Sequence, residues 1–210
     1  MKNQILKSLS ILIMLLLAII TIPAVYAGPV DNHIHSVPNS PPPLGGVEKY
    51  KYKVGDKGPG GGWIFFVDYY DQYPSFTYLE AAPEDVVGTF VWCSDFSTLI
   101  PGIDGWAGNA VGKGQLNTNA MLGYCTSGAA NEADKYFTST KSDWFLPSEG
   151  ELMLMYTNLR QAGVGGFAYN SYWSSTEYGS YDAWYQYFGL GYQGSLNKDY
   201  PLPVRAVRAF

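Results

Sequence analysis

The chain has 210 residues, with 13 Lys and Arg against 18 Asp and Glu, so its net charge is −5. An acidic balance does not attract polyanions, which argues against nucleic acid as a partner. Eighteen tyrosines and six tryptophans accompany few charged residues. This composition is typical of an ordered, tightly packed domain or of one that carries stacking surfaces for ligands.

The first 27 residues are typical of a cleaved secretory signal. Two lysines precede the apolar stretch 9–22, and small residues surround the position expected for a signal peptidase. A helix of fourteen residues reaches roughly 21 Å, short of the roughly 30 Å core of a bilayer. We expect cleavage between Ala27 and Gly28 and no membrane span in the mature chain. The protein would then be secreted, periplasmic or at the cell surface, and an uncleaved anchor is the alternative.

Residues 28–46 are rich in Pro, Gly, Asn and Ser, which indicates a flexible or polyproline-like spacer. One domain is expected over residues 47–210. Lys and Tyr alternate in residues 48–53, which predicts an edge strand. The glycine-rich turn 57–62 leads into an apolar run, Trp63–Val67, that has the composition of a strand. Because a phosphate loop opens a helix, these glycines do not indicate a nucleotide site.

The remaining chain predicts further short strands and two helical regions. Residues 117–137 have helical spacing in part, and Gly128 indicates a division into two pieces. The clearest helix covers residues 148–161 and begins with a capping box of Ser148 and Glu151. The other predicted strands are Phe76–Ala82, Ser171–Thr176, Asp182–Phe188 and Val204–Phe210, with glycines at 189, 191 and 194 marking the last turn. Together these elements predict an α+β domain with an antiparallel sheet.

The two cysteines, Cys93 and Cys125, are expected to form a disulfide in an oxidising compartment. The chain has no Cys-x-x-Cys motif, and its two histidines lie in the spacer. Neither a zinc site nor a thioredoxin-like site is therefore indicated.

Several short segments of the sequence resemble segments of one known family, and they occur in the same order as in that family. They are Val54–Gly62, Leu79–Asp85, Gly112–Thr118, Asp143–Ser148, Tyr172–Glu177, Ala183-Trp184 and Val204–Arg208. The chain resembles the C-terminal domain of the Legionella collagen-like adhesin, a family long catalogued as a domain of unknown function, over about residues 54–210. This resemblance implies a variant of the C-type-lectin-like fold. The adhesin is trimeric through its collagen-like stalk and binds sulfated glycosaminoglycans. This chain has no Gly-X-Y repeat, which argues against trimerisation, and its acidic charge argues against binding of sulfated polysaccharide.

Catalysis is not expected. The resemblance also implies a distant similarity in fold to formylglycine-generating enzymes, which hold copper with paired cysteines near the C-terminus. No cysteine follows Cys125 here. From residue 47 onward there is no histidine, which excludes Ser-His-Asp and Cys-His arrangements. Helix capping explains Glu149 and Glu151. A glycosidase would need a pair of carboxylates. Glu177, Asp182 and Asp199 are candidates for such a pair, but any exposed acid would qualify equally.

No cofactor is expected, and calcium is left open. The Glu-Pro-Asn or Gln-Pro-Asp turn and the Trp-Asn-Asp strand of calcium-dependent lectins are absent from the sequence. Asp143 and Glu177 offer hard oxygen ligands, but their spacing is not diagnostic.

A ligand surface is predicted on the strand near residue 185. Because side chains alternate along a strand, Tyr181, Tyr185 and Tyr187 share one face, and Trp184 and Phe188 share the other. The tyrosine face is the candidate ligand-binding surface, and the other face is predicted to be core. A mere covering role for these tyrosines is the alternative.

Two arginines near the C-terminus, Arg205 and Arg208, are predicted to point to opposite faces of the last strand, because their positions differ by an odd number. One of them is expected to brace the fold by pairing with a carboxylate such as Asp143 or Glu177. The other is expected to meet a ligand, and Arg205 is assigned to the ligand set. Trp144, Trp173 and residues 174–176 are predicted to be core. The sequence thus predicts a secreted, non-catalytic binding or adhesion domain that recognises carbohydrate or a protein surface; the alternative is a structural or assembly module of the cell envelope without a small ligand.

Overall fold

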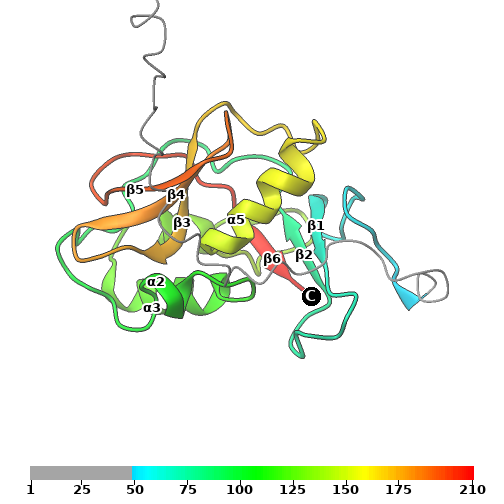
Figure 1. Ribbon diagram of the computed structural model, residues 1–210, viewed down its shortest axis with the longest axis horizontal. Helices are drawn as coiled ribbons and strands as arrows, with labels where there is room; N and C mark the ends of the chain where they lie inside the picture. Colours follow the sequence, from blue (N-terminus) through cyan, green and yellow to red (C-terminus); the bar gives the residue numbers. More distant parts are fainter. Residues whose placement is uncertain (1–48) are drawn as a thin grey trace, which may run out of the picture. The chain divides into compact units, whose positions relative to one another are not determined.

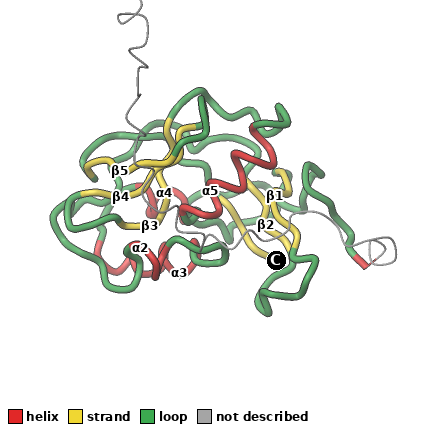
Figure 2. The backbone as a smooth tube through the Cα atoms, in the orientation of Figure 1, coloured by secondary structure: helices red, strands yellow, loops and turns green. Residues whose placement is uncertain are grey.

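The computed structural model describes residues 49–210 (Figures 1 and 2). The predicted signal, residues 1–27, and the predicted spacer, residues 28–46, lie outside the described residues. The elements are β1 (Trp63–Val67), β2 (Tyr78–Ala81), α2 (Gly105–Gly108), α3 (Gly114–Tyr124), α4 (Ala129–Asp134), α5 (Glu149–Met155), the π-helix η2 (Tyr156–Arg160), β3 (Ser171–Glu177), β4 (Asp182–Tyr187), β5 (Gln193–Asn197) and β6 (Val207–Ala209). Helices combined with antiparallel sheets confirm the α+β class.

The first sheet has the strand order β1-β2-β6, with β2 antiparallel to both neighbours. It therefore joins the start of the described chain to its end. β1 has the predicted bounds, whereas β2 and β6 are shorter than the predicted strands. The Phe210 carbonyl still accepts hydrogen bonds from the Thr77 and Tyr78 N–H groups at 2.8 and 2.9 Å, so the backbone pairing extends beyond β6.

The second sheet is an antiparallel meander of β3, β4 and β5. The sequence predicted β3 and β4 to within one residue at their ends but missed β5. The glycines in this region suggested only a turn. Gly194 in fact lies in β5, directly opposite Tyr185 of β4.

Helix α5 lies between the two sheets in Figure 1. Its predicted capping box is confirmed, because the Glu151 N–H donates to Ser148 Oγ at 3.2 Å and the Ser148 N–H donates to Glu151 Oε2 at 2.9 Å. The apolar spacing of the sequence predicts one buried helix face of Leu152, Met155, Tyr156 and Leu159. Three of these residues are fully buried, and Tyr156 is half-buried. The α-helix ends earlier than predicted and continues as η2. The spacing of apolar residues thus matches the buried face at three of its four positions.

The predicted division at Gly128 is confirmed, since it separates α3 from α4. Gly128 has φ 138°, and a Cβ there would lie 2.7 Å from the Trp92 carbonyl oxygen. Both the backbone angle and the close approach of the 92–93 segment therefore require glycine.

The edge strand predicted for residues 48–53 was wrong, because residues 49–53 form no strand. Side chains fix this segment instead of a backbone ladder. The rings of Tyr50 and Tyr69 meet edge-on at 5.1 Å, as do those of Tyr52 and Tyr78 at 5.3 Å. The alternation of the sequence thus reflects aromatic contacts and exposed lysines.

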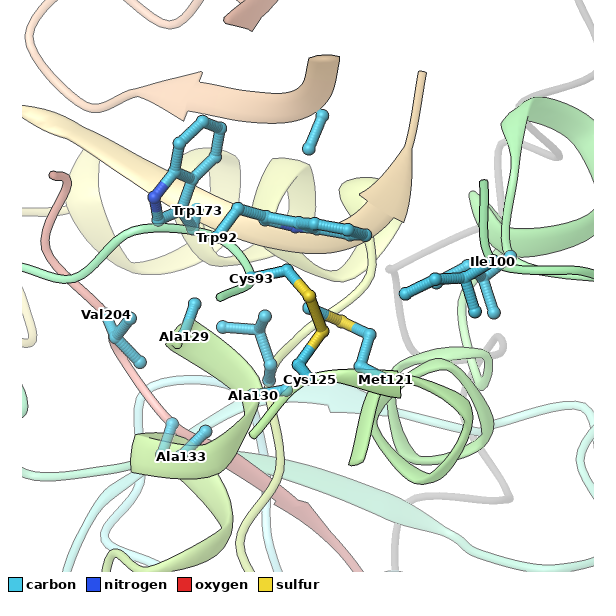
Figure 3. Close-up of a cluster of buried hydrophobic side chains, with 14 of the residues drawn as sticks. Trp92, Cys93, Ile100, Met121, Cys125, Ala129, Ala130, Ala133, Trp173 and Val204 are labelled. Carbon is cyan, nitrogen blue, oxygen red and sulfur yellow. A yellow bond between two sulfur atoms is a disulfide. The ribbon is translucent and has the colours of Figure 1, made fainter. Parts of the chain in front are cut away.

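The predicted disulfide between Cys93 and Cys125 is confirmed. Both cysteines are buried, at 1% and 2% exposure. Figure 3 shows the bridge among the side chains of Trp92, Met121 and Ala129 in one hydrophobic cluster. Trp144 and Trp173 belong to the same cluster and confirm the prediction that they are core. The bridge therefore joins the segment before the long 94–104 loop to the end of α3.

The glycine-rich turn binds a carboxylate of the protein itself. The N–H groups of Gly60 and Gly62 donate to the fully buried Glu80 at 2.7–3.1 Å. Arg208 Nη1 donates to the same carboxylate at 3.2 Å, and its Nε and Nη2 donate to Asp143, both at 2.8 Å. Four of the segments that carry the family resemblance therefore meet in one polar network that braces the first sheet.

Candidate functional site

Four tyrosine rings form a continuous row on one face of the β3-β4-β5 sheet. The ring centroids of Tyr169 and Tyr187 are 5.5 Å apart, those of Tyr187 and Tyr192 are 4.9 Å apart, and those of Tyr192 and Tyr185 are 6.5 Å apart. Tyr169 and Tyr192 are 62% and 52% exposed, and the two β4 rings, Tyr185 and Tyr187, are half-buried. We call these four residues the tyrosine row.

Strand alternation and register place the row. Tyr185 and Tyr187 are two residues apart on β4 and therefore share a face. The Tyr187 N–H donates to the Tyr192 carbonyl at 2.9 Å, which sets Tyr192 beside Tyr187. Tyr169 lies two residues before β3, whose first residue, Ser171, is paired with Tyr187.

Two glycines make room for the rings. A Cβ on Gly194 would lie 2.9 Å from the Tyr185 hydroxyl, and a Cβ on Gly189 would lie 2.6 Å from Tyr187 Cζ and 2.7 Å from Tyr169 Cε1. Gly194 therefore leaves space for the Tyr185 ring, and Gly189 leaves space for the rings of Tyr187 and Tyr169.

The two β4 tyrosines of the row are uncharged near neutral pH. Desolvation and then the neighbouring Tyr169 raise the pKa of Tyr187 above its usual value, and desolvation raises the pKa of Tyr185. Since a tyrosine ordinarily ionises near pH 10, both hydroxyls stay protonated and can donate as well as accept hydrogen bonds. These two residues therefore offer ring faces and neutral hydroxyl groups.

The structure brings together only part of the predicted tyrosine face. Tyr185 and Tyr187 belong to the row, whereas Tyr181 lies at the other end of β4 and is 60% exposed. Ala183, between Tyr181 and Tyr185, is fully buried in the hydrophobic cluster of Trp92 and the disulfide. The predicted surface is therefore two surfaces, separated by a stretch of core.

Arg205 does not lie where a ligand can reach it, which corrects its assignment to the ligand set. It is 1% exposed, and its Nε donates to Asp85 at 2.6 Å. Its Nη1 donates to the carbonyls of Ala82 and Gly165 at 3.1 and 2.8 Å. Both C-terminal arginines thus brace the fold, and the expected pairing with Asp143 is made by Arg208.

Glu177 was a candidate acid and oxygen ligand, and the structure buries it completely against Lys198. Lys198 Nζ also donates to the carbonyls of Thr98 and Ser180 at 3.0 and 2.8 Å. The Ile100 N–H donates to Glu177 at 2.9 Å. Burial raises the pKa of Glu177, and its bonds to Lys198 and Ile100 oppose that shift. The Glu177 carboxylate and the Lys198 ammonium group therefore both have their partners within the protein.

The opposite face of β4 contacts α5 and is core only in part. Phe188 is fully buried, as predicted. Trp184 is half-buried, its ring meets Tyr178 edge-on at 5.3 Å, and its buried indole N–H has no hydrogen-bond partner.

Within residues 49–210, no group of three His, Cys, Asp or Glu side chains comes together to hold a metal ion. No helix in the described part of the chain is both long enough and apolar enough to span a membrane.

Sequence reasoning missed two of the four rings. Tyr192 lies directly before β5, the strand that the sequence did not predict, and Tyr169 lies two residues before β3. The sequence does contain a pattern that indicates a hairpin here. Tyr192-Gln193-Gly194 can pair with Tyr185-Gln186-Tyr187 across a short turn that contains glycine. Recognising that hairpin would have placed Tyr192 beside Tyr187.

Glu149 makes stability depend on pH. Its half-buried carboxylate makes no hydrogen bond, and burial raises its pKa from 4.5 to about 7. Both folded and unfolded chains hold the proton below pH 4.5, so the cost of the buried charge appears only as pH rises toward 7. At ~1.4 kcal/mol per pKa unit, and with partial compensation at the first turn of α5, we expect Glu149→Gln to stabilise the domain by about 2 kcal/mol at pH 8.

Urea unfolding at pH 4.5 and pH 8 measures this effect. The two proteins should be equally stable at pH 4.5. Glu84→Gln, which alters an exposed acid, is the control and should leave the pH dependence unchanged. Equal stability of Glu149→Gln and the unmodified protein at pH 8 would contradict the argument.

Comparison with known proteins gives little more. No family model matches the chain, and no curated protein matches it. Among solved structures, a fimbrial protein from Bacteroides ovatus ATCC 8483 is similar to the chain, with a TM-score of 0.46 and 17% sequence identity. The similar region covers 66% of this chain but only 37% of the fimbrial protein, so this chain spans little more than a third of the fimbrial protein's length. A likeness of this size defines neither the fold nor the function.

Proposed function

We propose that the protein is an exported, non-catalytic binding domain of the C-type-lectin-like kind, in the family of the Legionella adhesin domain, and that it recognises carbohydrate through the tyrosine row. The observation that carries the proposal is the row itself: four adjoining rings over two glycines on an exposed sheet face. The predicted signal peptide and the buried disulfide support an oxidising location outside the cytoplasm.

The chemistry of the row fits a sugar. Aromatic ring faces complement the apolar C–H face of a pyranose, and tyrosine adds a hydroxyl that can bond to the sugar hydroxyls. Tyrosine also contributes large contact area at low cost in conformational entropy, because its side chain has only two rotatable bonds. No charged side chain belongs to the row, so a neutral glycan is favoured.

The first test is a glycan array with and without calcium, followed by titration of the retained glycan. We expect Tyr187→Ala and Tyr192→Ala each to weaken binding at least about tenfold, because each removes one stacking ring worth about 1 kcal/mol or more together with its hydroxyl contact. Tyr192 is half-exposed, so Tyr192→Ala should leave the melting temperature nearly unchanged.

The matched control is Tyr124→Ala, which removes an equally exposed tyrosine, 50% exposed, at the end of α3. It should bind the glycan as the unmodified protein does. A loss of binding in this control equal to that in Tyr192→Ala would contradict the role of the row. If no glycan is retained under either condition, the structural or assembly module becomes the better hypothesis.

A further inference from the structure

A second set of exposed aromatic side chains lies on three loops, away from the tyrosine row. The loops are residues 95–106, 178–182 and 198–200, and we call them the loop cluster. In Figures 1 and 2 they lie at the same end of the second sheet. Their large side chains are 48–64% exposed: Phe96, Leu99, Trp106, Tyr178, Tyr181 and Tyr200.

The buried ion pair holds the loop cluster together. Lys198 Nζ donates to Thr98 of the first loop and Ser180 of the second, while its own N–H donates to the Tyr181 carbonyl at 2.9 Å. Glu177, its partner, accepts from Ile100 and pairs through its backbone with Asp104. The exposed side chains are therefore mounted on backbone that is fixed by buried hydrogen bonds, which limits the entropy lost on binding.

The loop cluster is acidic as well as apolar. Asp95, Asp104 and Asp199 are exposed, and Asp182 is partly exposed. Hydrogen bonds from Thr98 and Ser97 hold the pKa of Asp95 below its usual value. Within these described loops the sole basic residue is Lys198, which is fully buried and neutralised by Glu177. The surface of the loop cluster therefore has only negative charge.

We propose that the loop cluster is a docking surface for a cationic protein segment, one rich in arginine or lysine. Charge complementarity selects this occupant: aspartates attract basic side chains, and the adjoining rings accept their cationic heads by cation–π contact. Arginine fits best, because its planar guanidinium stacks on aromatic rings while its N–H groups bind a carboxylate. Clusters of exposed aromatic side chains also mark interaction surfaces in general.

Binding of two synthetic twelve-residue peptides, alternating Arg-Ala and alternating Glu-Ala, tests the proposal in the mature protein. The arginine peptide should bind, more weakly as salt rises, and the glutamate peptide should not. Phe96→Ala and Tyr181→Ala should each weaken binding at least about fivefold, as should the double variant Asp95→Asn/Asp199→Asn.

Matched controls separate this surface from overall charge and from the tyrosine row. Phe137→Ala removes a ring that is 75% exposed outside the loop cluster, Glu84→Gln/Asp134→Asn removes two acids elsewhere, and Tyr192→Ala alters the row. All three should bind the arginine peptide as the unmodified protein does. Equal losses in the control and loop-cluster variants, or no binding of the arginine peptide at low salt, would overturn the proposal.

Discussion

Replacing Lys198 by methionine is expected to lower the free energy of unfolding by about 3–5 kcal/mol, because it leaves the Glu177 carboxylate buried without its cation. Both residues are fully buried, and Lys198 also satisfies the carbonyls of Thr98 and Ser180 and lies 4.9 Å from the centre of the Trp92 ring. Urea unfolding of the single variant measures the loss.

Two further variants give this prediction its controls. Lys198→Met/Glu177→Leu removes both charges and should be less destabilised than the single variant, since no unpaired charge remains. Lys135→Met breaks an exposed pair with Glu132 and should change stability by no more than about 1 kcal/mol. A cost below about 1 kcal/mol for Lys198→Met alone would show that the buried pair contributes little.

Removing the disulfide with Cys93→Ala/Cys125→Ala is expected to cost about 3 to 4 kcal/mol, because the bridge closes a loop with a sequence separation of 32 residues in the unfolded chain. Losing two buried sulfur atoms from the cluster around Trp92 adds to this cost. Thermal unfolding should show a melting temperature lower by ten degrees or more, as expected for a domain of this size.

Free-thiol titration of the unfolded, unreduced protein provides the complementary measurement. It should find no thiol, whereas full reduction should release two. Reduction should then destabilise the unmodified protein and leave the double alanine variant unchanged. Two titratable thiols before reduction would contradict the bridge.

Local patterns in the sequence were sufficient for much of the fold. The capping box of Ser148 and Glu151 placed the start of α5, since both bonds form within four residues. The cysteine pair gave the disulfide because only one intramolecular pairing exists. An apolar run gave β1, and two further segments of strand-like composition gave β3 and β4. Each of these signals depends on neighbouring residues or on a choice with a single solution.

The site depends on contacts between distant segments, and these the sequence did not give. Tyr169 reaches Tyr187 only because the Ser171–Tyr187 pairing sets the register of β3 against β4. Arg205 was assigned to a ligand because nothing nearby in sequence shows that Asp85, 120 residues away, takes its guanidinium group. Strand alternation grouped Tyr181 with Tyr185 and Tyr187 but could not show that Ala183, which lies between them, is covered by core.

The glycine at position 189 allows the ring arrangement to be separated from the tyrosines themselves. A methyl group there would enter the space of two rings at their outer ends, which can rotate away at little cost to the fold. Such a protein would keep every phenol, its ultraviolet absorbance and its net charge, yet would have lost the shape of the surface. Recognition by shape and recognition by composition can therefore be distinguished in this molecule without deleting an aromatic group.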